Sequence, residues 1–439
     1  MEIRDVVAGD VVQQAMAILR SLPAPDSPEA CVDRLQQVEQ ARRMLAGDHA
    51  LTTSRFVDYR QAEESRLKIP TSLQCKGMDA EVGFARGESP YVGGALTSTA
   101  TALCTVLPRT LAALLEGRVS EYHTRVVAEH TSHLSDAHRR EIDALIAHRL
   151  GKASTAQLRR LIQGHAYRLD RAAAEARVED NIRQRRVCQD PAGDGLVYVT
   201  AELPTHQGAA VMEALKQLTD QRLANDRPVD ADGTPLSRDQ VMTDLFVELL
   251  TGQTTAEGVS AEVIVVMQDT SLFGDDDLPA WLPGHGPVPA GIAKAWLTNP
   301  AAVKSLRRLY TRPTDGQLVA MDARRRRFPA SLAKMLRLRD DVCATPWCNS
   351  PVQDADHRHP WARGGPTSWQ NATGLCKRCN QRKEHRGWTY SGTVDELLVT
   401  TPTGHAYPAD TRPPLAELKH WSSDPPPLGT IDIAWPTAA

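Results

Sequence analysis

Two pairs of closely spaced cysteines near the C-terminal end of the chain constrain its fold more than any other feature. Cys343 and Cys348 are separated by four residues, and Cys376 and Cys379 by two. Each short loop can present two thiolates to the same ion, which is typical of a tetrahedral structural zinc site. Four protein ligands leave no open coordination position, so we expect this zinc to stabilise the fold and neighbouring residues to supply any chemistry.

Polar residues between the two cysteine pairs and directly after them are the candidate catalytic groups. Asp356 directly precedes His357, whose imidazole is of the type that accepts a proton from water near neutral pH. Asp356 and Asn380 offer hard oxygen atoms, which suit Mg²⁺ or Mn²⁺. Asn371 follows a Gly-Gly turn, where its amide can bond the loop backbone and hold the hairpin that carries His357. This set predicts phosphodiester hydrolysis, which requires an activated water and charge neutralisation on the phosphate.

The same stretch resembles the HNH endonucleases, a family of ββα-metal nucleases, with an added four-cysteine zinc ribbon. The residues that match the three motifs of the family are, in order, Asp356, His357, Pro360, Gly364, Gly365, Asn371 and Asn380. The third motif carries Asn in this chain, which makes it an H-N-N variant. The resemblance implies that His357 is the general base, that Asp356 and Asn380 hold one catalytic ion, and that Asn371 supports the loop.

The long region before the cysteines is similar to a more specific family. The segments LPRTLAALLEGRVS, LPGHGPVPAGIA and LRRLYTRPTDGQLVAMDARRRRF follow the order seen in the actinobacterial 13E12 repeat family, over residues 30–392. In that family a helical domain of unknown function, domain 222, precedes a C-terminal HNH module. The chain departs from the family at Gln353, where Cys is usual, and at Cys379–Asn380, where His-His is usual. Glu384 and His385 are further candidate ligands near Asn380.

The hydrophobic pattern predicts an α+β protein with a mostly helical N-terminal domain and a few strands, followed by a small ββα-metal zinc-ribbon module. Apolar residues recur at helical spacing between Val32 and Leu45, and Ser135 and Ser154 are expected N-caps. Alternation predicts strands at 195–203 and 260–267. The expected divisions are a helical domain at 1–300, a basic linker at 301–328, the nuclease domain at 329–392 and a Pro-rich tail at 393–439.

Charge is distributed unevenly along the chain, although its net value is only −3. Residues 301–392 contain 18 Lys or Arg and 7 Asp or Glu, a net charge of +11, and the remainder carries −14. A basic module on an acidic carrier predicts a polyanionic partner, and beside a nuclease motif we expect DNA. The cations expected to contact phosphate are Arg324, Arg325, Arg326, Arg327, Lys377, Arg378, Arg382 and Lys383.

Two further expectations concern location and a rival function. The four remaining cysteines are scattered, no run approaches a membrane span, and the first residues lack the apolar core of a signal peptide. We therefore expect a cytoplasmic protein with no membrane partner. The rival interpretation is a catalytically silent zinc-ribbon module that binds DNA. Such a module would keep the cysteines and the basic face but would not require Asp356 beside His357.

Overall fold

A computed structural model describes residues 8–225, 228–230, 232–252, 265–267, 271–272, 277–298 and 328–411. The chain divides into two compact units. The described residues of the first unit are 8–75 and 95–170, and those of the second are 76–94 and the residues from 171 onward. The arginine run at 324–327 and most of the strand predicted at 260–267 lie outside the described residues.

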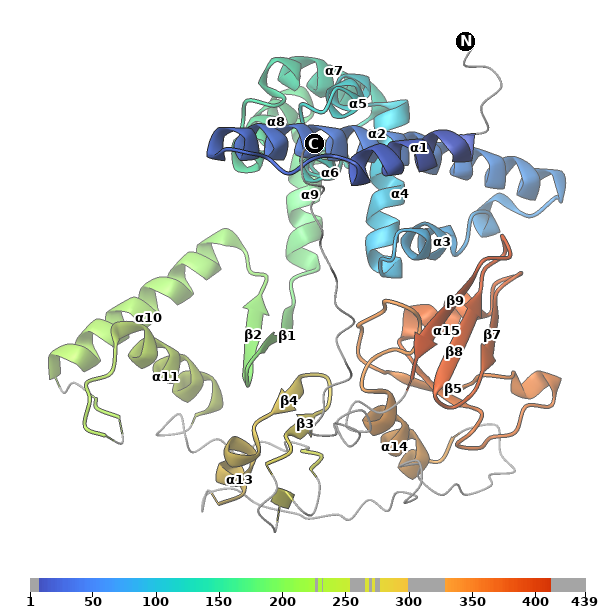
Figure 1. The fold of residues 1–439 in the computed structure, drawn as a ribbon. Helices are drawn as coiled ribbons and strands as arrows, with labels where there is room; N and C mark the ends of the chain where they lie inside the picture. Colours follow the sequence, from blue (N-terminus) through green and yellow to red (C-terminus); the bar gives the residue numbers. More distant parts are fainter. Residues whose placement is uncertain are drawn as a thin grey trace. The chain divides into compact units, whose positions relative to one another are not determined.

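The first unit is helical, as Figure 1 shows in blue to green. Its helices are α1 (Ala8–Arg20), α2 (Pro28–Arg66), most of α4 (Pro90–Thr105), α5 (Pro108–Leu115), α6 (Glu121–Thr131), α7 (Asp136–Ile146) and α8 (Thr155–Leu169), with 3-10 turns η2 (Thr71–Leu73) and η3 (Ala147–Arg149). Leu103, Leu114, Ile142 and Ile162 are almost completely buried and come from four different helices. The amphipathic periodicity of these four helices places apolar side chains in this shared core, whereas Val32, Leu35, Val38 and Leu45 of α2 are exposed.

Side-chain caps explain where several of these helices begin. The hydroxyls of Ser135 and Ser154 each accept a hydrogen bond from the backbone N–H three residues later, at 3.2 and 3.3 Å.

Asp143, fully buried on α7, accepts hydrogen bonds from the backbone N–H groups of Arg109 and Thr110 at the start of α5, at 2.6 and 3.0 Å. Burial raises the pKa of Asp143, whereas these hydrogen bonds stabilise its charged form.

The described helices can be compared with the length and apolar composition that a membrane-spanning helix requires. No single one of them is long and apolar enough to cross a bilayer. The pair α4 and α5 meets the same test jointly, with a bend of 108° between the two helices.

The second unit combines further helices with small antiparallel sheets. Its helices are α3 (Met78–Ala85), α9 (Arg171–Arg183), α10 (Thr205–Asn225), α11 (Arg238–Thr251), α13 (Ala290–Thr298), α14 (Ala330–Asp340) and α15 (Lys377–Lys383). The strands pair as β1 (Val187–Gly193) with β2 (Leu196–Ala201), β3 (Ala280–Leu282) with β4 (Gly286–Val288), and β5 (Asp354–His357) with β6 (Ala372–Leu375). A three-stranded sheet follows, in the order β7 (Thr389–Gly392), β8 (Glu396–Thr400), β9 (Ala406–Asp410). The predicted α+β class is confirmed.

The C-terminal sheet extends the cysteine-containing module beyond residue 392, where the sequence predicts a tail (Figure 1). Leu397 and Val399 on β8 are fully buried in a cluster that also contains the four cysteines and Trp388. Alternation in the segment ELLVT directs these two side chains to the same face of the strand. The prolines that suggested a tail are concentrated after residue 411, so they do not interrupt these strands.

A short helix from far upstream completes the core of the same module. Phe84 on α3 lies with its ring centroid 5.7 Å from Trp347, 6.1 Å from Trp388 and 5.3 Å from Tyr407. Gly77 precedes this helix with a φ of 83°, and a Cβ added there would lie 2.7 Å from the indole nitrogen of Trp388. Residues 78–85, which the sequence assigns to the helical domain, therefore pack as part of the C-terminal module.

Candidate metal centre and nuclease site

The four cysteine sulfurs of the C-terminal module converge on one point. All four side chains are buried, and their Sγ atoms lie within 4.8 Å of one another. The Sγ of Cys348 is 3.9 Å from that of Cys376 and 3.7 Å from that of Cys379. A tetrahedral ion with metal–sulfur distances of about 2.3 Å would place its ligands roughly 3.8 Å apart. The donor set and its spacing therefore fit a metal ion held by Cys343, Cys348, Cys376 and Cys379.

Local structure brings the second cysteine pair into position. Cys376 caps α15 and its sulfur accepts a hydrogen bond from the backbone N–H of Cys379 at 3.4 Å. Hydrogen bonds, the largest from Cys343, lower the pKa of the Cys348 thiol to about 6 and hold that of Cys376 well below its usual range. The hydrogen bonds among the sulfurs and burial raise the pKa values of the Cys343 and Cys379 thiols, so a metal ion that binds all four sulfurs must displace protons from the cluster.

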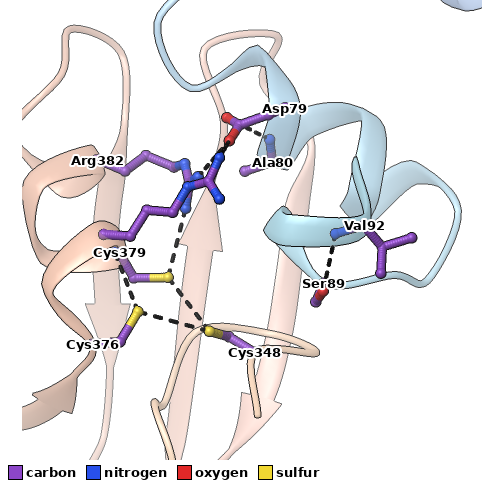
Figure 2. Close-up of polar contacts among 9 residues, drawn as sticks. Asp79, Ala80, Ser89, Val92, Cys348, Cys376, Cys379 and Arg382 are labelled. Carbon is purple, nitrogen blue, oxygen red and sulfur yellow. Dashed lines mark hydrogen bonds and ion pairs between the residues drawn. The ribbon is translucent and has the colours of Figure 1, made fainter. Parts of the chain in front are cut away.

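A buried arginine links the cysteine cluster to the upstream helix α3. Figure 2 shows Arg382 reaching from α15 past Cys379 to Asp79. Its guanidinium lies 3.6 Å from the Cys379 sulfur and 2.9 Å from Oδ2 of Asp79. Arg378 donates to the same carboxylate oxygen at 2.8 Å. A cluster of thiolates is anionic even with a divalent ion bound, so the positive charge of Arg382 complements it, and Asp79 orients that charge.

This interaction predicts that a residue far from the cysteines in sequence supports their module. We expect Asp79→Asn to lower the stability of the C-terminal module by about 2–3 kcal/mol, because it removes the carboxylate partner of the buried Arg382 and leaves only the cysteine cluster to balance its charge. Thermal unfolding followed by zinc release measures this effect. Glu88→Gln is the matched control, because Glu88 is an exposed acid of the same segment. Equal stability of the two variants would show that Asp79 does not support the module.

The hairpin β5–β6 and helix α15 form a ββα unit. Asp356 lies opposite Thr373 in the strand pairing, and His357 lies opposite Ala372. Asp354 and Asp356 alternate along β5 and both meet polar side chains of α15. The Asn380 amide donates to Oδ2 of Asp354 at 3.0 Å, and the Lys383 ammonium forms an ion pair with Oδ2 of Asp356. The hydrogen-bond partner of Asn380 is thus Asp354, whereas the sequence analysis expects Asn380 to share a catalytic ion with Asp356.

Helix α14 anchors the second strand of this hairpin. The buried Arg339 donates to the backbone carbonyls of Trp369 at 3.3 Å and Ala372 at 2.9 Å, and its guanidinium lies 4.6 Å from the centre of the Trp369 ring. The neighbouring Asp340 accepts a hydrogen bond from the backbone N–H of Gly374 at 2.5 Å. Two adjacent charged residues at the end of one helix therefore hold β6 in place.

His357 lies at the end of β5 and is buried. Its Nε2 is 2.8 Å from the hydroxyl of Thr367, and its Nδ1 is 3.9 Å from Oδ1 of Asp356. The Phe328 ring packs against the imidazole, with centroids 4.6 Å apart. If Nε2 carries the proton and donates a hydrogen bond to the Thr367 hydroxyl, Nδ1 is the basic nitrogen. Nδ1 lies on the side of the ring where Asp356 lies. The two ring nitrogens thus have different neighbours, the Thr367 hydroxyl at Nε2 and the Asp356 carboxylate near Nδ1.

Asn371 joins the two ends of the loop between β5 and β6. Its Oδ1 accepts a hydrogen bond from the backbone N–H of His359 at 2.7 Å, and its Nδ2 donates to the carbonyls of His359 and Pro366, both at 2.9 Å. Gly365 allows this closure, because a Cβ there would lie 1.9 Å from the His359 carbonyl oxygen. These contacts join the loop backbone as a bracing residue would, and the functional role of Asn371 stays a prediction.

We expect Asn371→Ala to destabilise the C-terminal module by about 2–4 kcal/mol. The change removes the side-chain partner of three backbone groups in a partly buried loop, and each unsatisfied group costs about 1–3 kcal/mol before relaxation and hydration. Chemical denaturation of the zinc-loaded protein measures the loss. Asn371→Asp retains the acceptor for His359 but sets a carboxylate oxygen against the carbonyl oxygens of His359 and Pro366, so it should destabilise at least as much as the Ala variant. An Ala variant as stable as the parent would contradict the bracing role.

The residues predicted to contact phosphate differ in how the structure places them. Lys377 and Arg378 are exposed on the first turn of α15, where Arg378 also pairs with Asp79. Arg382 and Lys383, by contrast, are buried and form ion pairs within the chain. Arg382 is directed toward Asp79 on α3, and Lys383 toward Asp356 on β5. A count of positive residues in the sequence does not reveal these ion pairs. The four consecutive arginines of the predicted linker lie outside the described residues.

Several residues of the site were missed in the sequence. Asp354 was identifiable from alternation, since it lies two residues before Asp356 on the same strand. No local pattern indicates Thr367 or Asp79, whose contacts join residues far apart in the chain. Glu384, considered as a further ligand, is exposed at the end of α15. The placements of Thr367 and Asp79 depend on tertiary packing, not on motif spacing.

Comparison with known proteins agrees with this arrangement. Residues 343–386 match the family described as "HNH endonuclease", and residues 32–340 match the "Domain of unknown function (DUF222)". A 128-residue stretch is 31% identical to the "Uncharacterized protein Rv2100" of Mycobacterium tuberculosis, and a 132-residue stretch is 31% identical to its "Uncharacterized protein Rv3776". These stretches cover 28% and 29% of this chain.

The curated relatives are longer than the matched region, and the matches cover only 22% and 24% of their lengths. No solved structure matches the chain. The family match at residues 32–340 spans well over half of the sequence and is followed directly by the match at residues 343–386. The chain therefore belongs to the DUF222 family and carries an HNH endonuclease domain at its cysteine-rich end.

Proposed function

We propose that this protein is an HNH endonuclease that hydrolyses phosphodiester bonds in DNA. The observation that carries the proposal is the Asp356–His357 pair at the end of β5, within the ββα unit of the matched HNH domain. His357 accepts a proton from the attacking water at Nδ1. In this proposal Nε2 donates its hydrogen bond to the Thr367 hydroxyl, which leaves the lone pair on Nδ1. Asn371 holds the loop that follows His357.

Two kinds of metal ion follow from the donor atoms. Zinc suits the four thiolates, which leave no open position, so we assign it a structural role. A second ion, Mg²⁺ or Mn²⁺, suits the carboxylate of Asp356 and the amide oxygen of Asn380, because both are hard oxygen donors on adjoining elements. When bound, this ion would neutralise charge on the scissile phosphate. Asp354, beside Asn380, supplies an additional carboxylate on the same face of β5.

DNA is supported as the substrate by the charge of the module. The region from 301 to 392 carries a net charge of +11, and phosphate contacts supply most of the affinity of a nucleic-acid-binding protein. Arg324 to Arg327 directly precede Phe328, whose ring lies against His357. The run is therefore adjacent in sequence to a residue that contacts the proposed catalytic base. Lys377 and Arg378 add exposed positive charge on α15.

One observation favours a second candidate, a catalytically silent zinc-ribbon module that binds DNA. The carboxylate of Asp356 is paired with Lys383, and the amide of Asn380 is paired with Asp354. Both proposed ion ligands thus have partners within the chain. A silent module would retain these pairs permanently and bind DNA through its basic surface alone.

The two functions are separated by incubating the zinc-loaded full chain with supercoiled plasmid. Parallel reactions contain Mg²⁺, Mn²⁺, or EDTA at a concentration that leaves the structural zinc in place. If the protein is a nuclease, we expect nicked or linear plasmid to form only when Mg²⁺ or Mn²⁺ is added. Binding without any cleavage, with single-stranded DNA and RNA tested as well, would overturn the nuclease and leave the silent module.

A further inference from the structure

The proposed catalytic ion and a lysine of the same domain require the same carboxylate. The ammonium of Lys383 forms an ion pair with Oδ2 of Asp356 and donates to the backbone carbonyl of His357 at 2.5 Å. Oδ1, the other carboxylate oxygen of Asp356, lies 3.9 Å from Nδ1 of His357. The lysine therefore occupies one side of Asp356 and contacts the backbone of the proposed base.

Burial makes this ion pair different from an ordinary surface salt bridge. The side chain of Lys383 is 5% exposed and that of Asp356 is 23% exposed. A buried ammonium requires a counter-ion and hydrogen-bond acceptors, and Asp356 and the His357 carbonyl supply them. The pairing also satisfies the carboxylate in the absence of any other cation. Lys383 is thus a built-in counter-ion at the proposed ion site.

Helix geometry places this counter-ion beside the second proposed ligand. Asn380 and Lys383 are three residues apart on α15, so they lie on the same side of the helix. Along β5, their partners Asp354 and Asp356 are two residues apart and share a face. The helix and the strand are therefore joined by two neighbouring polar pairs, and the Asp356–Lys383 pair involves a proposed ion ligand directly.

We propose that Lys383 competes with the divalent ion for Asp356, so that it weakens ion binding and leaves the carboxylate when the ion enters. This inference rests on the proposed function, which assigns Asp356 to a divalent ion. A divalent ion and an ammonium at one carboxylate repel each other strongly in a partly desolvated site. The ammonium can move away because it ends a flexible four-carbon chain, whereas Asp356 is held on a paired strand.

Binding of Mn²⁺ to the zinc-loaded full chain tests the competition without relying on cleavage. Free Mn²⁺ is measured by electron paramagnetic resonance during titration of the parent, Lys383→Met and Lys377→Met proteins. We expect Lys383→Met to bind Mn²⁺ about tenfold more tightly or better, in line with the coupling of close charge pairs. Lys377 is exposed on the same helix, so its substitution removes the same charge and should change affinity by less than about twofold.

A second measurement uses the unaltered protein and so does not depend on the folding of a variant. Amine acylation followed by mass spectrometry reports how accessible each lysine is. Lys383 should be protected in the ion-free protein and become at least several-fold more reactive with saturating Mn²⁺. Lys377 should react equally under both conditions. Unchanged protection of Lys383 with Mn²⁺ bound would overturn the competition.

Asp356→Asn separates failure of this inference from failure of the proposed function. If Mn²⁺ binding requires Asp356 but Lys383→Met binds no more tightly than the parent, only the competition is wrong. If no protein, including Lys383→Met, binds Mn²⁺ through Asp356, then both the competition and the proposed ion site are wrong. Tighter binding in Lys383→Met that is lost when Asp356→Asn is added supports both.

Discussion

Replacing Cys376 with Ser should remove the metal from the C-terminal module and unfold it, while the helical first unit remains folded. Cys376 supplies one of four converging sulfurs and caps α15. Metal binding in small structural zinc sites contributes about 10–16 kcal/mol in zinc-finger peptides, which is comparable to the entire stability of a typical domain. The four cysteines also belong to the buried cluster that contains Phe84, Trp388 and Leu397. Loss of one ligand therefore weakens both the metal site and the core.

Metal analysis and thermal unfolding together measure this effect. The variant should contain far less than one zinc per chain, and the unfolding transition of the C-terminal module should disappear. Cys188→Ser is the matched control, since Cys188 lies on the β1–β2 hairpin away from the cluster, and it should keep its zinc. Stoichiometric zinc and an unchanged melting curve in Cys376→Ser would rule out the four-sulfur site.

Replacing His357 with Ala should reduce DNA cleavage by roughly two to four orders of magnitude, the usual contribution of a positioned general base. The change removes no sulfur from the metal cluster and leaves Asp356 and Asn380 in place. Zinc content and DNA affinity should therefore persist, although loss of the ring contact with Phe328 lowers stability modestly. Single-turnover cleavage of a labelled duplex separates the chemical step from binding.

Two further variants test whether the loss of cleavage is specific to the imidazole of His357. Thr367→Val removes the hydroxyl bonded to Nε2 but keeps the imidazole, so cleavage should fall less than in His357→Ala. His405→Ala removes an exposed histidine from the β8–β9 turn and should cleave at the parent rate. Cleavage by His357→Ala at the parent rate, with contaminating nuclease excluded, would show that the Asp356–His357 pair is not the catalytic centre.

Short-range patterns in the sequence predicted much of the helical region and the principal motifs. Ser135 and Ser154 mark helix starts that the structure reproduces, because capping depends on residues within one turn. The grouping of Cys343, Cys348, Cys376 and Cys379 was predictable for a related reason. Two short loops bring each pair together, and the hairpin between them requires only local strand pairing. The predicted bracing position of Asn371 also depended on a single loop.

The boundaries of the C-terminal module were not predictable in the same way. The sequence places residues 78–85 in the helical domain and begins a tail at 393, whereas Phe84 and Leu397 share the buried core with the cysteines. Phe84 and Leu397 are separated by more than three hundred residues, so no local pattern connects them. Burial of apolar area against a common cluster decides their place, and that cluster exists only after the chain has folded.

The sequence by itself determined which chemical groups this protein brings to its HNH domain: four thiolates, an Asp-His pair, bracing and ligand amides, and a surplus of positive charge. Tertiary structure alone decided how those groups are paired. Arg382 and Lys383 appear in the sequence as two more cations, but the folded helix buries them against Asp79 and Asp356. The reason is physical: spacing specifies which face of a helix a residue occupies, whereas the charge opposite that face comes from segments that only packing brings together.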